Sequence, residues 1–417
     1  MNFPTPVPQS SESAPVDPRT GRHATAAQGI LLLAASSMPV LGTVLISPVL
    51  PSIGQQFGND PAAAALVPLI ASAPALLIGL LSPVAGLLVE RLGSKRVLLI
   101  GLVVYALVGT APAFLNSLAP IIATRLAVGA AEAFIMTCCT ALITDYYVQR
   151  MRVRYLSLQA VVTALAATVF LALGGLLGNL GWRAPFWVYP VSLVLAVAGW
   201  LILWPVGRRS SQTTAGPTRT RLSARVLAFP MAISFIAAIV LLIPIVQLPY
   251  LLVGAGTTSP GTIGLTAAIV SLATALGAFT YPLLVRVIDP AKVRIVAFVL
   301  AGCGLLVVPL TPGATGIAAA MAITSLGTGS LLPGLVTWAV DAVPPSRRGQ
   351  GIGWWWSSIY LGQFASPLVV VALSEVLGGL TVAVVAVGGV SVATALFLVF
   401  VPATPRPTVS ETVAVEG

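Results

Sequence analysis

Charged side chains are scarce in this chain: Asp, Glu, Lys and Arg make up only 8% of its 417 residues, whereas 57% are hydrophobic. Soluble domains contain about 25% charged residues, so this composition cannot cover a water-soluble globule of this size. The uncharged runs extend over about 20 residues or more, the length that an α-helix needs to cross a bilayer. The alternating segments of about ten residues that mark a membrane β-barrel do not occur. The expected fold class is therefore an all-α integral membrane protein in contact with a lipid bilayer.

Histidine and cysteine are also nearly absent, with one His and three Cys in the whole chain. The cysteines, Cys138, Cys139 and Cys303, lie inside apolar runs with no CxxC or Cys/His spacing, so neither a disulfide framework nor a metal site is expected. No GxxxxGK[ST] motif occurs, which argues against ATP-driven transport by this chain. The net charge of +10 would suit nucleic acid, but the basic residues lie in short loops, so no nucleic-acid partner is expected.

Twelve membrane-spanning helices are predicted, six on each side of the longest internal loop, GRRSSQTTAGPTRTRLSAR, whose composition is typical of a flexible linker. The predicted spans are 27–50, 62–88, 97–115, 118–144, 155–179, 184–206, 226–252, 262–286, 293–311, 314–341, 350–376 and 379–402. The predicted domains are a disordered cytoplasmic tail at 1–26, a six-helix bundle at 27–206, a cytoplasmic linker at 207–225, a six-helix bundle at 226–402 and a cytoplasmic tail at 403–417.

The basic residues are distributed unequally between the two faces of the membrane. Nineteen of the 21 Lys and Arg fall in the tails and in the loops after every second predicted span, whereas the loops of the opposite face contain only Arg183. An excess of Lys and Arg marks the cytoplasmic side, so both termini are expected in the cytoplasm. The expected location is that of a multi-pass protein of the cell (inner) membrane.

The two halves of the chain are weakly similar to each other. A fixed offset of 196 residues places Arg96 on Lys292 and Asp145 on Asp341, so two separate loops agree on one offset. Parallel six-helix repeats of this kind are a transporter architecture. The sequence therefore predicts two pseudo-symmetric bundles of six helices.

One short loop, GLLVERLGSKRV at 86–97, contains several of the scarce charges. Its glycines, Gly86 and Gly93, permit close helix approach and a tight turn. Its basic side chains hold the loop at the cytoplasmic face. Glu90 can accept hydrogen bonds from the N-terminus of a neighbouring helix, where the macrodipole favours an anion.

This loop resembles the loop between the second and third helices of the major facilitator superfamily, commonly written G-x-L-a-D-r-x-G-r-K-x-x-l, with Glu90 in place of the usual aspartate. The resemblance covers essentially the whole hydrophobic chain, and it implies a monomer. It also implies a latch between the halves that closes when the transporter faces outward; the alternative is a topology signal only. The residues expected to form this conformational latch are Gly86, Glu90, Arg91, Gly93, Lys95, Asp145 and Arg150.

Two charges, Arg125 and Glu132, lie inside the predicted span 118–144. Seven residues separate them, so they share a helix face about 10 Å apart along the axis. An isolated charge in a membrane costs from about 3 to over 10 kcal/mol, so both must face a wet or paired interior. The segment RLAVGAAEA resembles the R-x-x-x-G pattern of the family's fourth helix. We expect Glu132 to load and release a proton beside Arg125; the alternative is a fixed pair that holds helices together.

The predicted span 155–179 contains three glycines, Gly174, Gly175 and Gly178, at a spacing that lets a neighbouring backbone approach closely. The segment resembles part of the glycine-rich fifth helix of proton-coupled drug antiporters, although it lacks that motif's Gly-Pro step. This resemblance favours export.

Four polar side chains of the second half, Gln247, Tyr250, Tyr360 and Gln363, are the expected substrate-cavity residues because they lie inside predicted spans and can form hydrogen bonds. For each of them, packing alone is an alternative of about equal weight.

These observations predict a secondary active transporter that works by alternating access and needs no cofactor, with the proton gradient as its energy source. The expected activity is proton-coupled export of a small amphipathic organic compound. One alternative is proton-coupled uptake of a small organic anion that pairs with Arg125. A membrane-embedded enzyme or sensor is disfavoured, because the spans have no cluster of nucleophile, base or metal ligands and no ring of charges.

Overall fold

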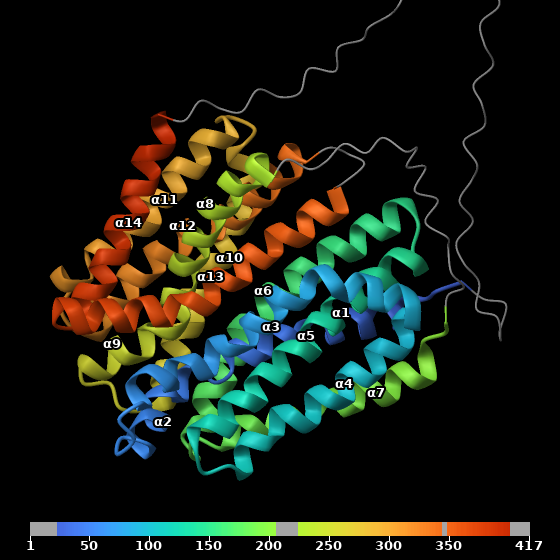
Figure 1. The fold of residues 1–417 in the computed structure, drawn as a ribbon, viewed down its shortest axis with the longest axis horizontal. Coiled ribbons are helices and arrows are strands. Elements are labelled where there is room, and N and C mark those ends of the chain that lie inside the picture. Colours follow the sequence, from blue (N-terminus) through green and yellow to red (C-terminus); the bar gives the residue numbers. More distant parts are fainter. Residues whose placement is uncertain (1–22, 206–223, 344–347, 401–417) are drawn as a thin grey trace, which may run out of the picture.

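The computed structural model describes residues 23–205, 224–343 and 348–400, which form long helices joined by short turns (Figure 1). The first half contains α1 (Ala26–Val44), η1 (Ser47–Val49), α2 (Leu50–Gln56), α3 (Ala63–Leu92), α4 (Ser94–Thr110), η2 (Ala111–Phe114), α5 (Leu118–Tyr146), α6 (Gln149–Gly178), η3 (Ala184–Val188) and α7 (Val191–Ile202). The second half contains α8 (Ala224–Val246), α9 (Leu248–Gly254), α10 (Pro260–Leu284), α11 (Pro290–Leu306), η4 (Val308–Leu310), α12 (Gly313–Ala342), α13 (Arg348–Leu377) and α14 (Leu380–Phe400).

Within the described ranges, 11 helical segments are long and apolar enough to cross a membrane. The 17-residue helix α11, continued by η4, lies where the ninth span is predicted. The prediction of an all-α membrane protein is thus confirmed, and the number of passes agrees with twelve. The predicted linker and both tails lie mostly outside the described residues, so the domain boundaries stay predictions.

Two predicted spans differ from the structure because each is broken near one end. The first continues past Val44 as η1 and α2, and the seventh is interrupted at Gln247 before α9. Proline has no N–H to continue the helical ladder, and Pro48 and Pro249 are each the second residue of the segment that follows the break. Membrane helices tolerate such breaks when neighbouring groups satisfy the freed carbonyls. In Figure 1, α2 and α9 lie close together at one end of the molecule.

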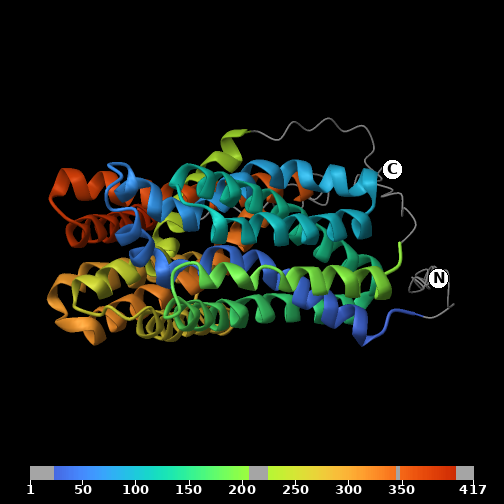
Figure 2. The same cartoon turned by 90° about the horizontal axis from the view of Figure 1, so that it is seen from below.

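The two halves form separate bundles that meet along several helices. In Figures 1 and 2 the second-half helices, from yellow to red, gather on the left, and most first-half helices gather on the right. The apolar core of the first half also includes Leu242 and Val246 of α8. The core of the second half includes Val44 of α1 and Leu171 of α6. Contacts between the halves are made chiefly by α3 with α13 and by α6 with α10, and α1 and α8 contribute these few apolar side chains.

Candidate functional site in the membrane core

Helix α5 supplies the two charged residues of the membrane core. Arg125 and Glu132 both have no exposed surface, and they lie on the helix that packs against α3 and α4. Neither side chain faces the lipid, as expected from the high free-energy cost of a charge in the hydrocarbon region. Their hydrogen bonding, however, differs completely.

The guanidinium of Arg125 is held by three oxygen atoms of the protein. Its Nε donates to the carbonyl of Ile70 over 3.1 Å, and one terminal nitrogen donates to the hydroxyl of Tyr189 over 2.7 Å. The other terminal nitrogen donates to the carbonyl of Gly42. Arg125 therefore ties α5 to α3, to α1 and to the turn between η3 and α7.

Proline and glycine residues make this arrangement possible. Pro74 stands four residues after Ile70 and has no N–H, so it leaves the Ile70 carbonyl without a helical partner. The last backbone hydrogen bond of α1 runs from the Leu45 nitrogen to the Leu41 carbonyl. The helix ends there, so the next carbonyl, that of Gly42, has no helical N–H as its partner. A Cβ at Gly129 would lie 2.1 Å from the Pro74 carbonyl oxygen, so glycine is required where α5 crosses α3.

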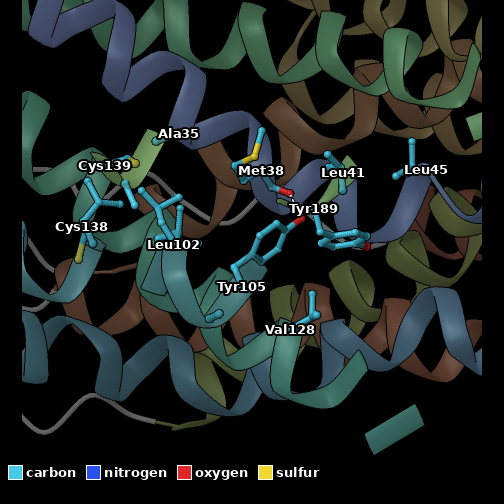
Figure 3. Close-up of a cluster of buried hydrophobic side chains, with 14 of the residues drawn as sticks. Ala35, Met38, Leu41, Leu45, Leu102, Tyr105, Val128, Cys138, Cys139 and Tyr189 are labelled. Atoms are coloured by element: carbon cyan, nitrogen blue, oxygen red, sulfur yellow. Dashed lines mark hydrogen bonds between the residues drawn. The ribbon is translucent and has the colours of Figure 1, made fainter. Parts of the chain in front are cut away.

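Two tyrosines complete this part of the core. The Tyr105 hydroxyl donates to the Met38 carbonyl over 2.6 Å, and the rings of Tyr105 and Tyr189 lie 5.1 Å apart (Figure 3). Sequence reasoning missed both tyrosines, because nothing in their local sequence distinguishes them from packing residues. Pro74 did give a signal, since a proline inside a span always frees the carbonyl four residues earlier.

Glu132 has no such partners. Within the described part of the chain, neither of its carboxyl oxygens has a hydrogen-bond partner. A Cβ at Gly42 would lie 1.9 Å from Oε1 of Glu132, so the carboxyl group abuts the backbone of α1 at the residue whose carbonyl binds Arg125. An ionised carboxylate is costly in such a place, whereas the neutral acid is tolerated better. The acid therefore lies close to the Arg125 assembly without taking part in its hydrogen bonds.

The second half reaches this region through α13. The Tyr360 hydroxyl lies 3.4 Å from the Sδ atom of Met136, which is one helical turn beyond Glu132 on α5. The ring of Tyr360 stacks on Trp356 with centroids 5.7 Å apart. Gln363 is half-buried one turn further along α13. The structure thus brings Tyr360 and Glu132, predicted separately from the two halves, into one region.

The other two predicted cavity residues lie at the break between α8 and α9. Gln247 is only 3% exposed, and its amide nitrogen has no hydrogen-bond partner in the described ranges. The hydroxyl of Tyr250, one turn later, is buried and likewise unpartnered there. Both groups can therefore donate a hydrogen bond to a ligand.

The predicted latch contributes contacts within the first half. Gly93 joins α3 to α4 at φ +88°, a left-handed conformation that favours glycine. The Lys95 ammonium donates to the Trp200 carbonyl over 3.1 Å and to the Leu203 carbonyl, at the C-terminal end of α7. Of the remaining latch residues, Arg91 and Arg150 are exposed, Gly86 and Asp145 are half-buried, and the side chain of Glu90 lies outside the described part. A latch between the halves stays a prediction.

The three glycines of α6 lie at crossings that leave no space for a side chain. A Cβ at Gly174 would lie 1.9 Å from the Leu45 carbonyl oxygen. A Cβ at Gly175 would lie 2.7 Å from the Cα of Gly264 on α10, and one at Gly178 would lie 2.5 Å from Val49 of η1. Helix α6 therefore packs closely against both η1 and the second half.

A family model, described as the Major Facilitator Superfamily, matches residues 32–254 and again residues 229–416. The chain belongs to the Major Facilitator Superfamily. Membership of this superfamily makes it a membrane transporter of small molecules rather than an enzyme, and it fits the buried polar groups described above.

Several known proteins are similar to this chain in sequence or in fold. Multidrug resistance protein 2 of Bacillus subtilis (strain 168) is 28% identical over 182 residues, which are 42% of this chain and 43% of that protein. The match thus spans less than half of the length of that relative. Two crystal structures of a bacterial homolog of the human lysosomal transporter Spinster, both inward-facing, share the fold. The occupied form has a TM-score of 0.73 at 18% identity over 89% of this chain and 94% of that chain. The unoccupied form has a TM-score of 0.70 at 17% identity, over 90% of this chain and 94% of that chain.

Proposed function

We propose that this transporter works by alternating access and exports a small amphipathic organic compound in exchange for protons. The observation that carries the proposal is Glu132, a fully buried acid without a hydrogen-bond partner in the described residues. It lies where α1 and α5 meet, one turn from the contact that Tyr360 makes from the second half.

The surroundings of Glu132 suit a group that gains and loses a proton. In the enclosed state the neutral acid is favoured, since no donor among the described residues forms a hydrogen bond with the carboxylate. When rocking of the halves admits water, hydration stabilises the charged form and the proton leaves. A carboxyl group with fixed hydrogen-bond donors would instead remain charged in both states and carry no proton.

The role of Arg125 favours a substrate without a full negative charge. Arg125 already donates to Ile70, Gly42 and Tyr189, and these bonds would have to break before the guanidinium could bind a carboxylate. Uptake of an organic anion, the second candidate, is therefore less well supported. The stacked rings of Trp356 and Tyr360 suit an apolar or aromatic part of a substrate.

Further support comes from the second half and from the relatives. The free donors of Gln247 and Tyr250 suit a hydrogen-bond acceptor on the substrate. The name of the Bacillus subtilis relative agrees with export of organic compounds. We further propose a location in the inner membrane with both termini in the cytoplasm, on the Lys and Arg distribution, and a monomeric state.

Transport by Glu132→Gln in proteoliposomes tests the proposal. The glutamine is similar in size and cannot release a proton, so flux driven by an imposed pH gradient should be lost while solute exchange without a gradient continues. Glu375→Gln, at an exposed position near the end of α13, is the matched control and should transport normally. Undiminished gradient-driven flux in Glu132→Gln would remove Glu132 from proton coupling.

A further inference from the structure

One end of the molecule is closed by a junction between the halves. We define this junction as η1 and the C-terminal turn of α6 from the first half, with α9 and the N-terminal turn of α10 from the second. The hydroxyl of Ser47 in η1 donates to the carbonyl of Ile245, which Pro249 leaves without a helical partner. Backbones of α6 and α10 touch at Gly175 and Gly264. Alternating access requires this end to open once in each cycle.

Asn179, the C-cap residue that follows α6, reaches across the junction to the first turn of α10. Its Oδ1 accepts from the backbone nitrogen of Gly261 over 3.0 Å and from the hydroxyl of Ser259 over 3.3 Å. Ser259 is the N-cap residue of α10, yet its own side chain makes no capping bond. A Cβ at Gly261 would lie 2.5 Å from the Asn179 amide nitrogen, so glycine leaves the space that this contact needs. The start of α10 is therefore capped by a residue of the other half.

This geometry has a consequence for the transport cycle. The first amides of a helix need an acceptor, and a side-chain oxygen at this place stabilises the helix start. When the halves separate at this end, α10 loses its cap from Asn179 and water must replace it. The closed end is thus favoured by a bond that exists only while the halves are together.

We propose that Asn179 is a positioning residue of the transport cycle, whose cap on α10 sets how readily this end opens. The proposal rests on the alternating-access part of the proposed function and is independent of the proton and of the substrate. Removal of the side-chain oxygen should shift the population toward the state open at this end. A carboxylate at the same place should shift it the other way, because a helix N-terminus favours an anion.

A single cysteine at position 49 reports on opening of the junction. Val49 in η1 has no exposed surface and lies against Gly178. Val49→Cys is introduced into a chain in which Cys138, Cys139 and Cys303 are alanine, and the protein is reconstituted in lipid nanodiscs, where both ends are accessible. The rate of labelling by a polar maleimide then measures the open population, without any transported solute.

Four variants are compared in this background. Asn179→Ala should raise the labelling rate about three- to tenfold, the range expected for two partly solvated hydrogen bonds. Ser259→Ala removes one of the two bonds and should raise the rate less. Asn179→Asp keeps the acceptor oxygen and should label no faster than the parent. Gly175→Leu cannot close against Gly264 and sets the upper limit.

The results separate this inference from the proposed function. If Asn179→Ala is labelled faster than the parent and Asn179→Asp is not, the proposed role of the Asn179 cap is supported, whatever the transport assays of Glu132→Gln show. Equal rates for the two Asn179 variants would overturn it, because a general packing defect affects both. A Gly175→Leu variant that labels no faster than the parent would also overturn it, since Val49 would then not report on this junction.

Discussion

The hydrogen bond between Arg125 and the Ile70 carbonyl predicts a measurable energetic coupling between Arg125 and Pro74. The carbonyl is available because Pro74 cannot donate to it, and Arg125 Nε lies 3.1 Å away. In Pro74→Ala the new N–H competes for the same oxygen. In Arg125→Met the oxygen is left buried and unpaired, and in the double variant alanine satisfies it again.

The magnitude follows from the groups that lose their partners. Arg125→Met removes three buried hydrogen bonds and leaves the Ile70 carbonyl unpaired, whereas the Gly42 carbonyl keeps only the 3.4 Å bond from the Tyr189 hydroxyl. We therefore expect the free energy of unfolding to fall by about 3–5 kcal/mol. Pro74→Ala can restore one of these three bonds. Hydrogen bonds between membrane helices contribute up to about 2 kcal/mol, so the double variant should recover about 1–2 kcal/mol relative to the sum of the single changes.

Reversible unfolding in mixed micelles with a rising fraction of denaturing detergent, followed by tryptophan fluorescence, measures these free energies. Pro83→Ala is the matched control, because Pro83 lies in the same helix and frees the carbonyl of Gly79, to which Arg125 does not donate in the described structure. Pro83→Ala and Arg125→Met should therefore be additive. Additivity of Pro74→Ala with Arg125→Met would refute the reasoning, because the Ile70 carbonyl would then not be shared between the two residues.

Two further substitutions test other parts of the structure. Gly129→Val should destabilise the protein by about 3 kcal/mol or more, because its Cβ would lie 2.1 Å from the Pro74 carbonyl oxygen. Thermal unfolding followed by size-exclusion chromatography measures the loss. An unchanged melting temperature would contradict the close crossing of α5 and α3. Lys95→Met removes the ammonium from the C-terminal carbonyls of α7 and should cost about 0.5–1 kcal/mol in the same assay, whereas Lys292→Met, on α11 in the second half, serves as the comparison.

Composition and the spacing of apolar runs were sufficient to predict the fold class and the order of the spans. A helix in lipid must satisfy its backbone internally, so length and hydropathy alone determine where it crosses the membrane. The breaks at Pro48 and Pro249 were not predicted, because a proline inside a span can be accommodated in several ways. Which way is used depends on the groups of neighbouring helices.

The candidate site was predicted in part. The rarity of charge inside the spans was enough to single out Arg125 and Glu132, since each must have a functional or structural reason to be there. The sequence suggested a joint role for the two. In the structure their hydrogen bonding differs: Arg125 donates to three oxygens of other segments, whereas Glu132 has no hydrogen-bond partner within the described residues. Tyr105, Tyr189 and Asn179 escaped notice because a tyrosine or an asparagine is common in many environments.

The sequence by itself determined that this chain spans the membrane many times, that its two halves are related and that α5 contains an isolated acid. These properties follow from local hydropathy and from the cost of charge in lipid. Only the tertiary structure decided which side chain meets which carbonyl. Those contacts depend on helix crossings, such as that of Gly129 with Pro74, which join residues far apart in the chain and leave no local pattern in the sequence.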